Sequence, residues 1–95
     1  MGMEINKYES VFKALSDITR LNVLKELSKE DSICVCDLVE HFDIKQSKLS
    51  YHLKLLLDSD LITMERQGKW NYYSININEL ERYLSKEVIS NILNK

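Results

Sequence analysis

Two cysteines separated by one residue are the side chains in this sequence best suited to chemistry. Cys34 and Cys36 flank Val35, and the 95-residue chain contains no other cysteine. Paired thiolates are soft ligands, suited to arsenite, antimonite or another thiophilic ion. Paired thiols also oxidise, either to each other or with small thiols. A third interpretation is that one or both are small hydrophobic side chains in a core, because free cysteine is commonly buried.

The spacing of the cysteines sets a geometric condition for a shared site. Residues two apart in a regular helix lie about 200° around its axis, so both sulfurs cannot face one atom. Residues two apart in an extended segment project to the same face. A shared site therefore requires that Cys34 lies outside a helix, or that the helix unwinds in its first turn when the ligand binds. A helix N-terminus beside the thiols would lower their pKa and favour the thiolate.

The residues after the cysteines are typical of two short helices separated by a tight turn. Leu38, Val39 and Phe42 give the first helix an apolar face, and the pattern breaks at Asp43-Ile44. The apolar spacing resumes at Leu49, Leu53, Leu56 and Leu57. The other face of this second helix carries amides, hydroxyls and cations: Gln46, Ser47, Lys48, Ser50, Tyr51 and Lys54. Such a face suits a DNA major groove, where amides and hydroxyls contact base edges and lysines contact phosphates.

Two further helices are predicted ahead of the cysteines. The first covers residues 4–15, with one apolar stripe formed by Ile5, Tyr8, Phe12 and Leu15. Ser16 is expected to cap the second helix, which runs to about Lys29. That helix is expected to bury Ile18, Leu21, Leu24 and Leu27, with Val23 at the edge of the stripe. Ile33 to Val35 is expected to be a short extended segment.

The sequence after Asp60 predicts a β-hairpin followed by a helix. Residues 61–66 and 70–75 are rich in β-branched and aromatic residues, and Gly68 supplies the positive φ that the turn needs. Trp70, Tyr72 and Tyr73 are interpreted as packing within the hairpin. Arg66 and Lys69 at its turn are expected to reach phosphates or the minor groove. An apolar stripe at helical spacing then covers residues 78–94.

This order of elements predicts a single domain over residues 1–95 that is mostly α, in the α+β class. It is a winged helix-turn-helix with a two-stranded β-hairpin wing and an extra helix at each end. The net charge is −2, but residues 45–69 contain five cations and three acids, so the positive excess lies on the expected DNA-binding elements. No apolar run is long enough to cross a bilayer, and no signal peptide is evident, so a cytoplasmic location without membrane contact is expected. No nucleophile–base–acid set, phosphate loop or catalytic metal motif indicates an enzyme.

Three stretches of the sequence resemble the ArsR/SmtB family of metal-responsive repressors. They are FKALSDITRLNVLKEL, CVCDLVEHFDIKQSKLSYHLKLLLDSDLI and ERQGKWNYYSI, which together cover most of the chain from about Phe12 to Ile75. The resemblance implies an obligate homodimer built from the first and last helices. It also implies binding to a pseudo-palindromic operator, with release when a metal or metalloid binds Cys34 and Cys36. No cofactor is implied beyond the inducer, which would be As(III), Sb(III) or a trivalent organoarsenical.

The chain departs from the family's sensor patterns in three ways. Arsenic sensors with a third cysteine place it where this chain has Val39, and no cysteine precedes Cys34 as it does in the cadmium and lead sensors. The third ligand of arsenic would then be hydroxide, a small thiol or a methyl group, or one of Asp37, Glu40 and His41. No histidine follows His52, which disfavours the family's other, zinc-binding site. His52 itself is expected to be packed or solvent-facing.

The sequence therefore favours a metalloid-responsive transcriptional repressor. The alternatives are a repressor whose cysteines sense redox state, and a winged-helix module for protein contacts, which the acidic net charge would suit.

Overall fold

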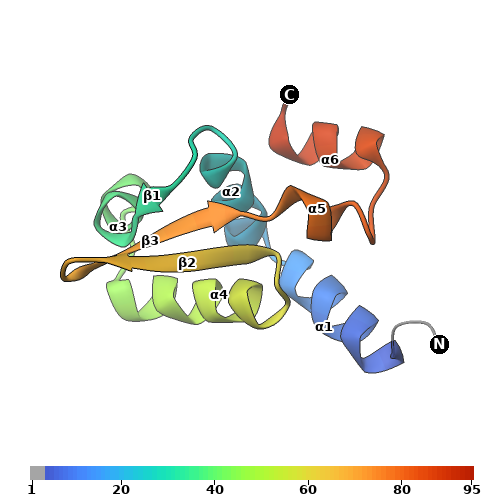
Figure 1. Cartoon of the computed structure of the whole chain (residues 1–95), viewed down its shortest axis with the longest axis horizontal. Helices are drawn as coiled ribbons and strands as arrows, with labels where there is room; N and C mark the ends of the chain where they lie inside the picture. The colour runs from blue at the N-terminus through green and yellow to red at the C-terminus, as the bar shows by residue number, and fades with distance from the viewer. Residues whose placement is uncertain (1–3) are drawn as a thin grey trace.

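The computed structural model describes residues 4–95, so residues 1–3 of the predicted domain lie outside the described part. The elements in chain order are α1 (Ile5–Leu15), α2 (Ile18–Leu27), β1 (Ile33–Cys34), α3 (Val35–Phe42), α4 (Gln46–Asp58), β2 (Ile62–Gln67), β3 (Trp70–Ile75), α5 (Ile77–Leu80) and α6 (Lys86–Leu93). Helix α4 runs below the β2–β3 hairpin, and α1 and α6 lie at the end of the molecule away from the hairpin turn (Figure 1). The mostly helical winged helix-turn-helix expected from the sequence is confirmed.

The sheet has three strands in the order β1-β3-β2, where the sequence analysis expected two. The short segment before α3 pairs antiparallel with β3, placing Ile33 opposite Tyr73 and Cys34 opposite Tyr72. Gly68 has φ +65° in the hairpin turn, as predicted. Of the aromatic residues interpreted as hairpin packing, Tyr73 is buried in the core, whereas Trp70 is 42 % exposed near that turn.

The buried face of α2 is rotated from the one predicted. Ile18 is 72 % exposed, whereas Val23 is fully buried beside Leu24 and Leu27. Ile18 is the first residue of α2 and is not among its buried residues. The face that packs therefore begins at Arg20 and continues through Val23, Leu24 and Leu27 at helical spacing.

Asp17, not Ser16, caps α2. The Asp17 Oδ1 atom accepts hydrogen bonds from the backbone N–H groups of Thr19 at 2.8 Å and Arg20 at 3.3 Å. The Ser16 N–H instead donates to the Lys13 carbonyl and ends α1. The prediction of Ser16 was wrong because Ser16 is the C-cap of α1, whereas Asp17 has the extended backbone of an N-cap (φ −157°, ψ 131°).

Replacing Asp17 with alanine is expected to lower the free energy of unfolding by about 1 kcal/mol, because two N–H groups lose their acceptor. Urea unfolding followed by circular dichroism measures this change. Ser16→Ala is the matched control and should leave the free energy of unfolding nearly unchanged. An equal loss in both variants would contradict the assignment of the cap.

The C-terminal segment forms two short helices, where one continuous helix over residues 78–94 was expected. Asn76 caps α5 by accepting from the Glu79 N–H at 3.3 Å, and Ser85 caps α6 by accepting from the Val88 N–H at 3.1 Å. The bend between them lets both Leu80 and the later residues of α6 reach the core. The ring of Tyr83 in the connecting segment packs edge-on against Tyr8 and Phe12 of α1.

Candidate nucleic-acid interface and thiol site

Helix α4 presents one exposed polar face, called here the reading face. All six of its side chains predicted to contact DNA are exposed: Gln46, Ser47, Lys48, Ser50, Tyr51 and Lys54. The opposite face packs Leu49, Leu53 and Leu56 into the core. Asp43 has a left-handed backbone (φ 52°, ψ 47°) that ends α3 and turns the chain into α4. Helix α4 is therefore anchored to the core through its leucine face, and its polar face is accessible to a DNA groove.

The predicted wing cations lie at the hairpin turn and are exposed. Arg66 Nε donates to the Gly68 carbonyl at 3.1 Å, and Lys69 Nζ lies 5.6 Å from the centre of the Trp70 ring. On α4, Lys54 Nζ forms an exposed ion pair with Asp58 at 3.2 Å. An exposed pair of this kind is weak, so exchanging it for a phosphate costs little.

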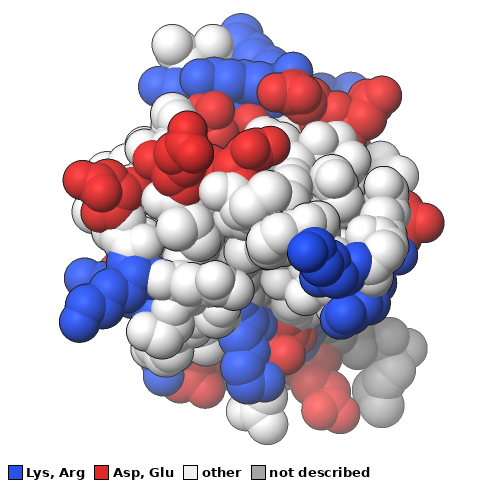
Figure 2. Space-filling view, turned by 90° about the vertical axis from the view of Figure 1, so that its left-hand side faces the viewer, with Lys and Arg blue, Asp and Glu red and all other residues white. Residues whose placement is uncertain are grey.

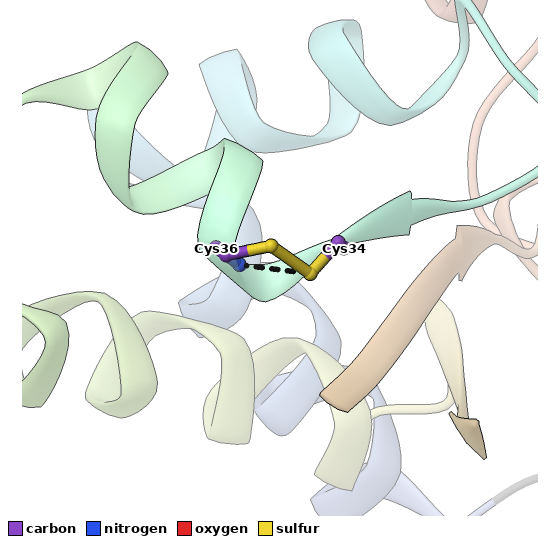
Figure 3. Close-up of a disulfide and its surroundings, with 2 residues drawn as sticks. All are labelled: Cys34 and Cys36. Atoms are coloured by element: carbon purple, nitrogen blue, oxygen red, sulfur yellow. Dashed lines mark hydrogen bonds between the residues drawn. A yellow bond between two sulfur atoms is a disulfide. The ribbon is translucent and has the colours of Figure 1, made fainter. Parts of the chain in front are cut away.

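Cys34 lies outside the helix, which satisfies the geometric condition for a shared sulfur site. It is the last residue of β1 and the N-cap of α3, with an extended backbone (φ −64°, ψ 141°). Cys36 lies in the first turn of α3, and the two sulfurs are joined in a disulfide (Figure 3). The Cys36 N–H donates to Cys34 Sγ at 3.2 Å. Cys34 is buried and Cys36 is exposed, so one edge of the sulfur pair faces solvent.

The three residues considered as a third arsenic ligand line a separate cleft. Asp37, Glu40 and His41 border a cleft of about 350 Å³ together with Glu26 and Glu30 of the preceding segment, and neither cysteine lines it. His41 Nε2 lies 3.3 Å from Glu26 Oε1. Figure 2 shows this end of the molecule, where acidic side chains gather in the upper half and basic ones lie above, beside and below them. Across residues 4–95 no group of three or more Cys, His, Asp and Glu side chains has the arrangement of a metal site.

His52 is packed, as expected, but its partner was not anticipated. His52 Nδ1 lies 2.9 Å from Arg20 Nη1, and both side chains are buried. Burial lowers the pKa of His52, and the Arg20 and Lys48 charges lower it further, against an opposing effect of Asp17. The signal available in the sequence was the helical spacing of Arg20 from Leu24 and Leu27, which does not identify His52 as the partner.

Comparison with known proteins identifies the family of the chain. The family model described as "Bacterial regulatory protein, arsR family" matches residues 17–64, from the cap of α2 to the start of the wing. The chain belongs to the ArsR family. It is 52 % identical over 84 residues to the arsenical resistance operon repressor of Bacillus subtilis (strain 168), covering 88 % of this chain and 80 % of that one. It is 39 % identical to the arsenical resistance operon repressor of Staphylococcus aureus, covering 78 % of this chain and 70 % of that one.

A solved structure agrees with this assignment. A crystal structure of an ArsR family transcriptional regulator matches with a TM-score of 0.75 and 27 % identity, covering 93 % of each chain. The chain is therefore a DNA-binding transcriptional regulator and not an enzyme, and its homologues include arsenical resistance operon repressors. Among the described residues, no helix combines the length and apolar character needed to span a membrane.

Proposed function

We propose that this chain is a cytoplasmic repressor that binds operator DNA as a homodimer and leaves it when trivalent arsenic or antimony binds Cys34 and Cys36. The observation that carries the proposal is the meeting of the two sulfurs at the amino end of α3. The similarity to arsenical resistance operon repressors supports the choice of ligand. The exposed reading face of α4 supports the choice of DNA as partner.

The ligand binds the reduced form of the pair. Each sulfur displaces one hydroxide of arsenous acid, and each thiol proton leaves with it as water. The third position on arsenic is taken by hydroxide, a small thiol or a methyl group, because the only two cysteines are both used. Ligands that need two sulfurs, such as methylated trivalent arsenic, therefore compete well with inorganic arsenite. Zinc binds weakly because a tetrahedral set of four protein ligands is lacking.

Ligand binding acts on DNA affinity through the start of α3. In the reduced pair the sulfurs are not joined, so an arsenic atom held by both ties Cys34 to Cys36 and distorts the first turn of α3. Cys34 also pairs with Tyr72 of β3, and β3 forms the wing with β2. Distorting that turn therefore shifts α3 relative to both the wing and the helix that follows it.

The disulfide favours a second candidate, a repressor that senses redox state. In that case a peroxide or a small disulfide accepts two electrons and two protons from the dithiol, and the S–S bond forms. Release of fluorescently labelled operator should be measured in parallel with arsenite, antimonite, cadmium, zinc and peroxide. Release by arsenite in the presence of a phosphine reductant supports the metalloid function. Release by peroxide alone, reversed by the phosphine, supports the redox function and overturns the first proposal.

The assignment of the reading face predicts different effects for two substitutions. Gln46→Ala should reduce discrimination between operator variants, because an amide contact to a base edge is lost. Lys69→Ala should weaken binding to all sequences about equally and reduce the salt slope by about one phosphate contact. Anisotropy titrations against wild-type and mutated operators at several salt concentrations measure both effects.

Lys86→Ala is the matched control for these two variants, because Lys86 is an exposed lysine on α6, away from the hairpin turn. Unchanged discrimination in Gln46→Ala would show that Gln46 does not contact bases. An equal loss of affinity in Lys86→Ala would contradict the assignment of the wing.

A further inference from the structure

Arg20 is a buried cation whose contacts join three helices. It is 7 % exposed and lies on the packed face of α2. Its Nε atom donates to the Ala14 carbonyl at 2.8 Å and its Nη2 atom donates to the Lys13 carbonyl at 3.2 Å, both in the last turn of α1. Its Nη1 atom reaches His52 Nδ1, in the middle of α4. The guanidinium therefore joins the end of α1 to α4, whose exposed face is proposed to contact DNA.

The contact with His52 fixes the state of the imidazole. A guanidinium has only donors, so His52 Nδ1 accepts the hydrogen bond and the proton of the neutral ring is on Nε2. His52 is 5 % exposed. The charged groups acting on it are Asp17 and Arg20 from α2 and Lys48 from α4. A second proton on the ring would turn Nδ1 into a donor facing the Arg20 guanidinium, which is also a donor. The added charge would lie near the cations of Arg20 and Lys48 and the carboxylate of Asp17.

The position of His52 relates this contact to DNA binding. Lys48 lies one turn before His52 on α4, and the Tyr51 ring packs edge-on against the His52 ring at 5.4 Å between centres. Both Lys48 and Tyr51 belong to the reading face. A restraint on His52 therefore restrains the turn of α4 from which these two side chains project.

We propose that Arg20 and neutral His52 are positioning residues that hold α4 in its DNA-binding orientation against the end of α1. This inference rests on the proposed operator binding and adds a link from α1, a helix of the expected dimer interface, to the helix that contacts bases. The distance between the two recognition helices of a dimer has to match successive major grooves, about 34 Å apart. Because the Arg20–His52 contact holds α4 against α1, that distance depends on the protonation state of His52.

The first test is the pH dependence of operator affinity. Affinity should fall as the pH drops from about 7.5 to about 5.5, by no more than about tenfold, because protonation of His52 breaks the contact with Arg20 and burial keeps the pKa of His52 below its ordinary value. Simple electrostatics predicts the opposite sign, because a protonated histidine adds positive charge that attracts DNA. Circular dichroism at each pH shows whether the protein remains folded.

Variants at the two histidines identify the group responsible. His52→Leu keeps the volume but removes the acceptor, and should weaken operator binding about tenfold at neutral pH. His52→Asn restores an acceptor near the Nδ1 position without a titrating group. It should recover most of that affinity and lose the pH dependence. His41→Asn changes the chain's other histidine, which is exposed on α3, and should keep the wild-type pH profile.

Further variants separate positioning from loss of stability. Arg20→Lys keeps the charge but cannot span all three acceptors, so it should weaken operator binding about as much as His52→Leu. Val23→Ala removes buried volume from α2 without touching the pair, and should leave affinity unchanged where it is folded. If His52→Leu does not fold, Arg20→Lys and His52→Asn provide the comparison. Wild-type affinity in Arg20→Lys, or a wild-type pH profile in His52→Asn, would overturn the inference.

The failure of this inference is distinguishable from failure of the proposed function. If the wild-type chain shows no salt-dependent binding to a palindromic duplex, the proposed function fails. The Arg20–His52 contact can then be tested without DNA, from the NMR chemical shifts of the His52 imidazole nitrogens and the hydrogen-exchange rates of the α4 backbone amides. Arg20→Lys should raise the pKa of His52 and speed exchange in the middle of α4, and unchanged values would overturn the link.

Discussion

Replacing either Cys34 or Cys36 with serine is expected to abolish release of operator by arsenite. The wild-type protein should lose operator affinity about 5- to 150-fold on binding arsenite, which corresponds to a coupling of roughly 1–3 kcal/mol. Each single variant should lose this response, because one remaining thiol cannot bridge the start of α3. The measurement is anisotropy of labelled operator during arsenite titration, with a phosphine present to keep the thiols reduced.

The serine variants should still bind operator without arsenite. A serine hydroxyl is a good N-cap acceptor and can replace the Cys34 sulfur that accepts from the Cys36 N–H. Asp37→Asn and His41→Asn are the controls, because both residues line the separate cleft beside α2. They should respond to arsenite as the wild type does. Release of operator at wild-type arsenite concentrations in either serine variant would contradict the two-thiol mechanism. Loss of the arsenite response in a control variant would show that the substituted cleft residue is a ligand.

The sequence was sufficient for the elements that depend on local patterns. Leucines at helical spacing on α4, the break at Asp43-Ile44 and the positive φ of Gly68 each have a local physical cause, and each matches the structure. The separation of α4 into a buried leucine face and an exposed polar face followed from the same spacing. The reading face was therefore predictable before its surroundings were known.

Features that depend on distant partners were missed. The pairing of β1 with β3 involves a strand of two residues, too short for a pattern, and its partner lies far along the chain. Arg20 and His52 are 32 residues apart, so no window of sequence joins them. The stripe through Leu80, Leu84 and Val88 is continuous at helical spacing, so the cap at Ser85 gave the only local sign of a break.

The exposed apolar residues on α1 and α6 are the physical reason to expect a dimer. Ile5, Tyr8 and Phe12 on α1 and Val88 on α6 are all exposed in the single chain. Leu80, which falls in the apolar stripe predicted for residues 78–94, is instead buried within the chain's own core. Ile89 and Leu93 are buried there too, so deleting the C-terminal helices would damage the fold as well as the interface. A point substitution at an exposed residue is the sharper test.

Phe12→Asp is expected to convert the proposed dimer to a monomer, because the interface would bury two unpaired carboxylates in place of aromatic rings. Operator affinity should then fall by about 10²- to 10⁴-fold, since the two half-sites no longer bind as one linked unit. Sedimentation velocity measures the first effect and anisotropy with a palindromic duplex measures the second. Met64→Asp is the matched control, because Met64 on β2 is 46 % exposed and Phe12 is 48 % exposed. It should remain dimeric. A Phe12→Asp protein that still sediments as a dimer would place the interface elsewhere and remove α1 from it.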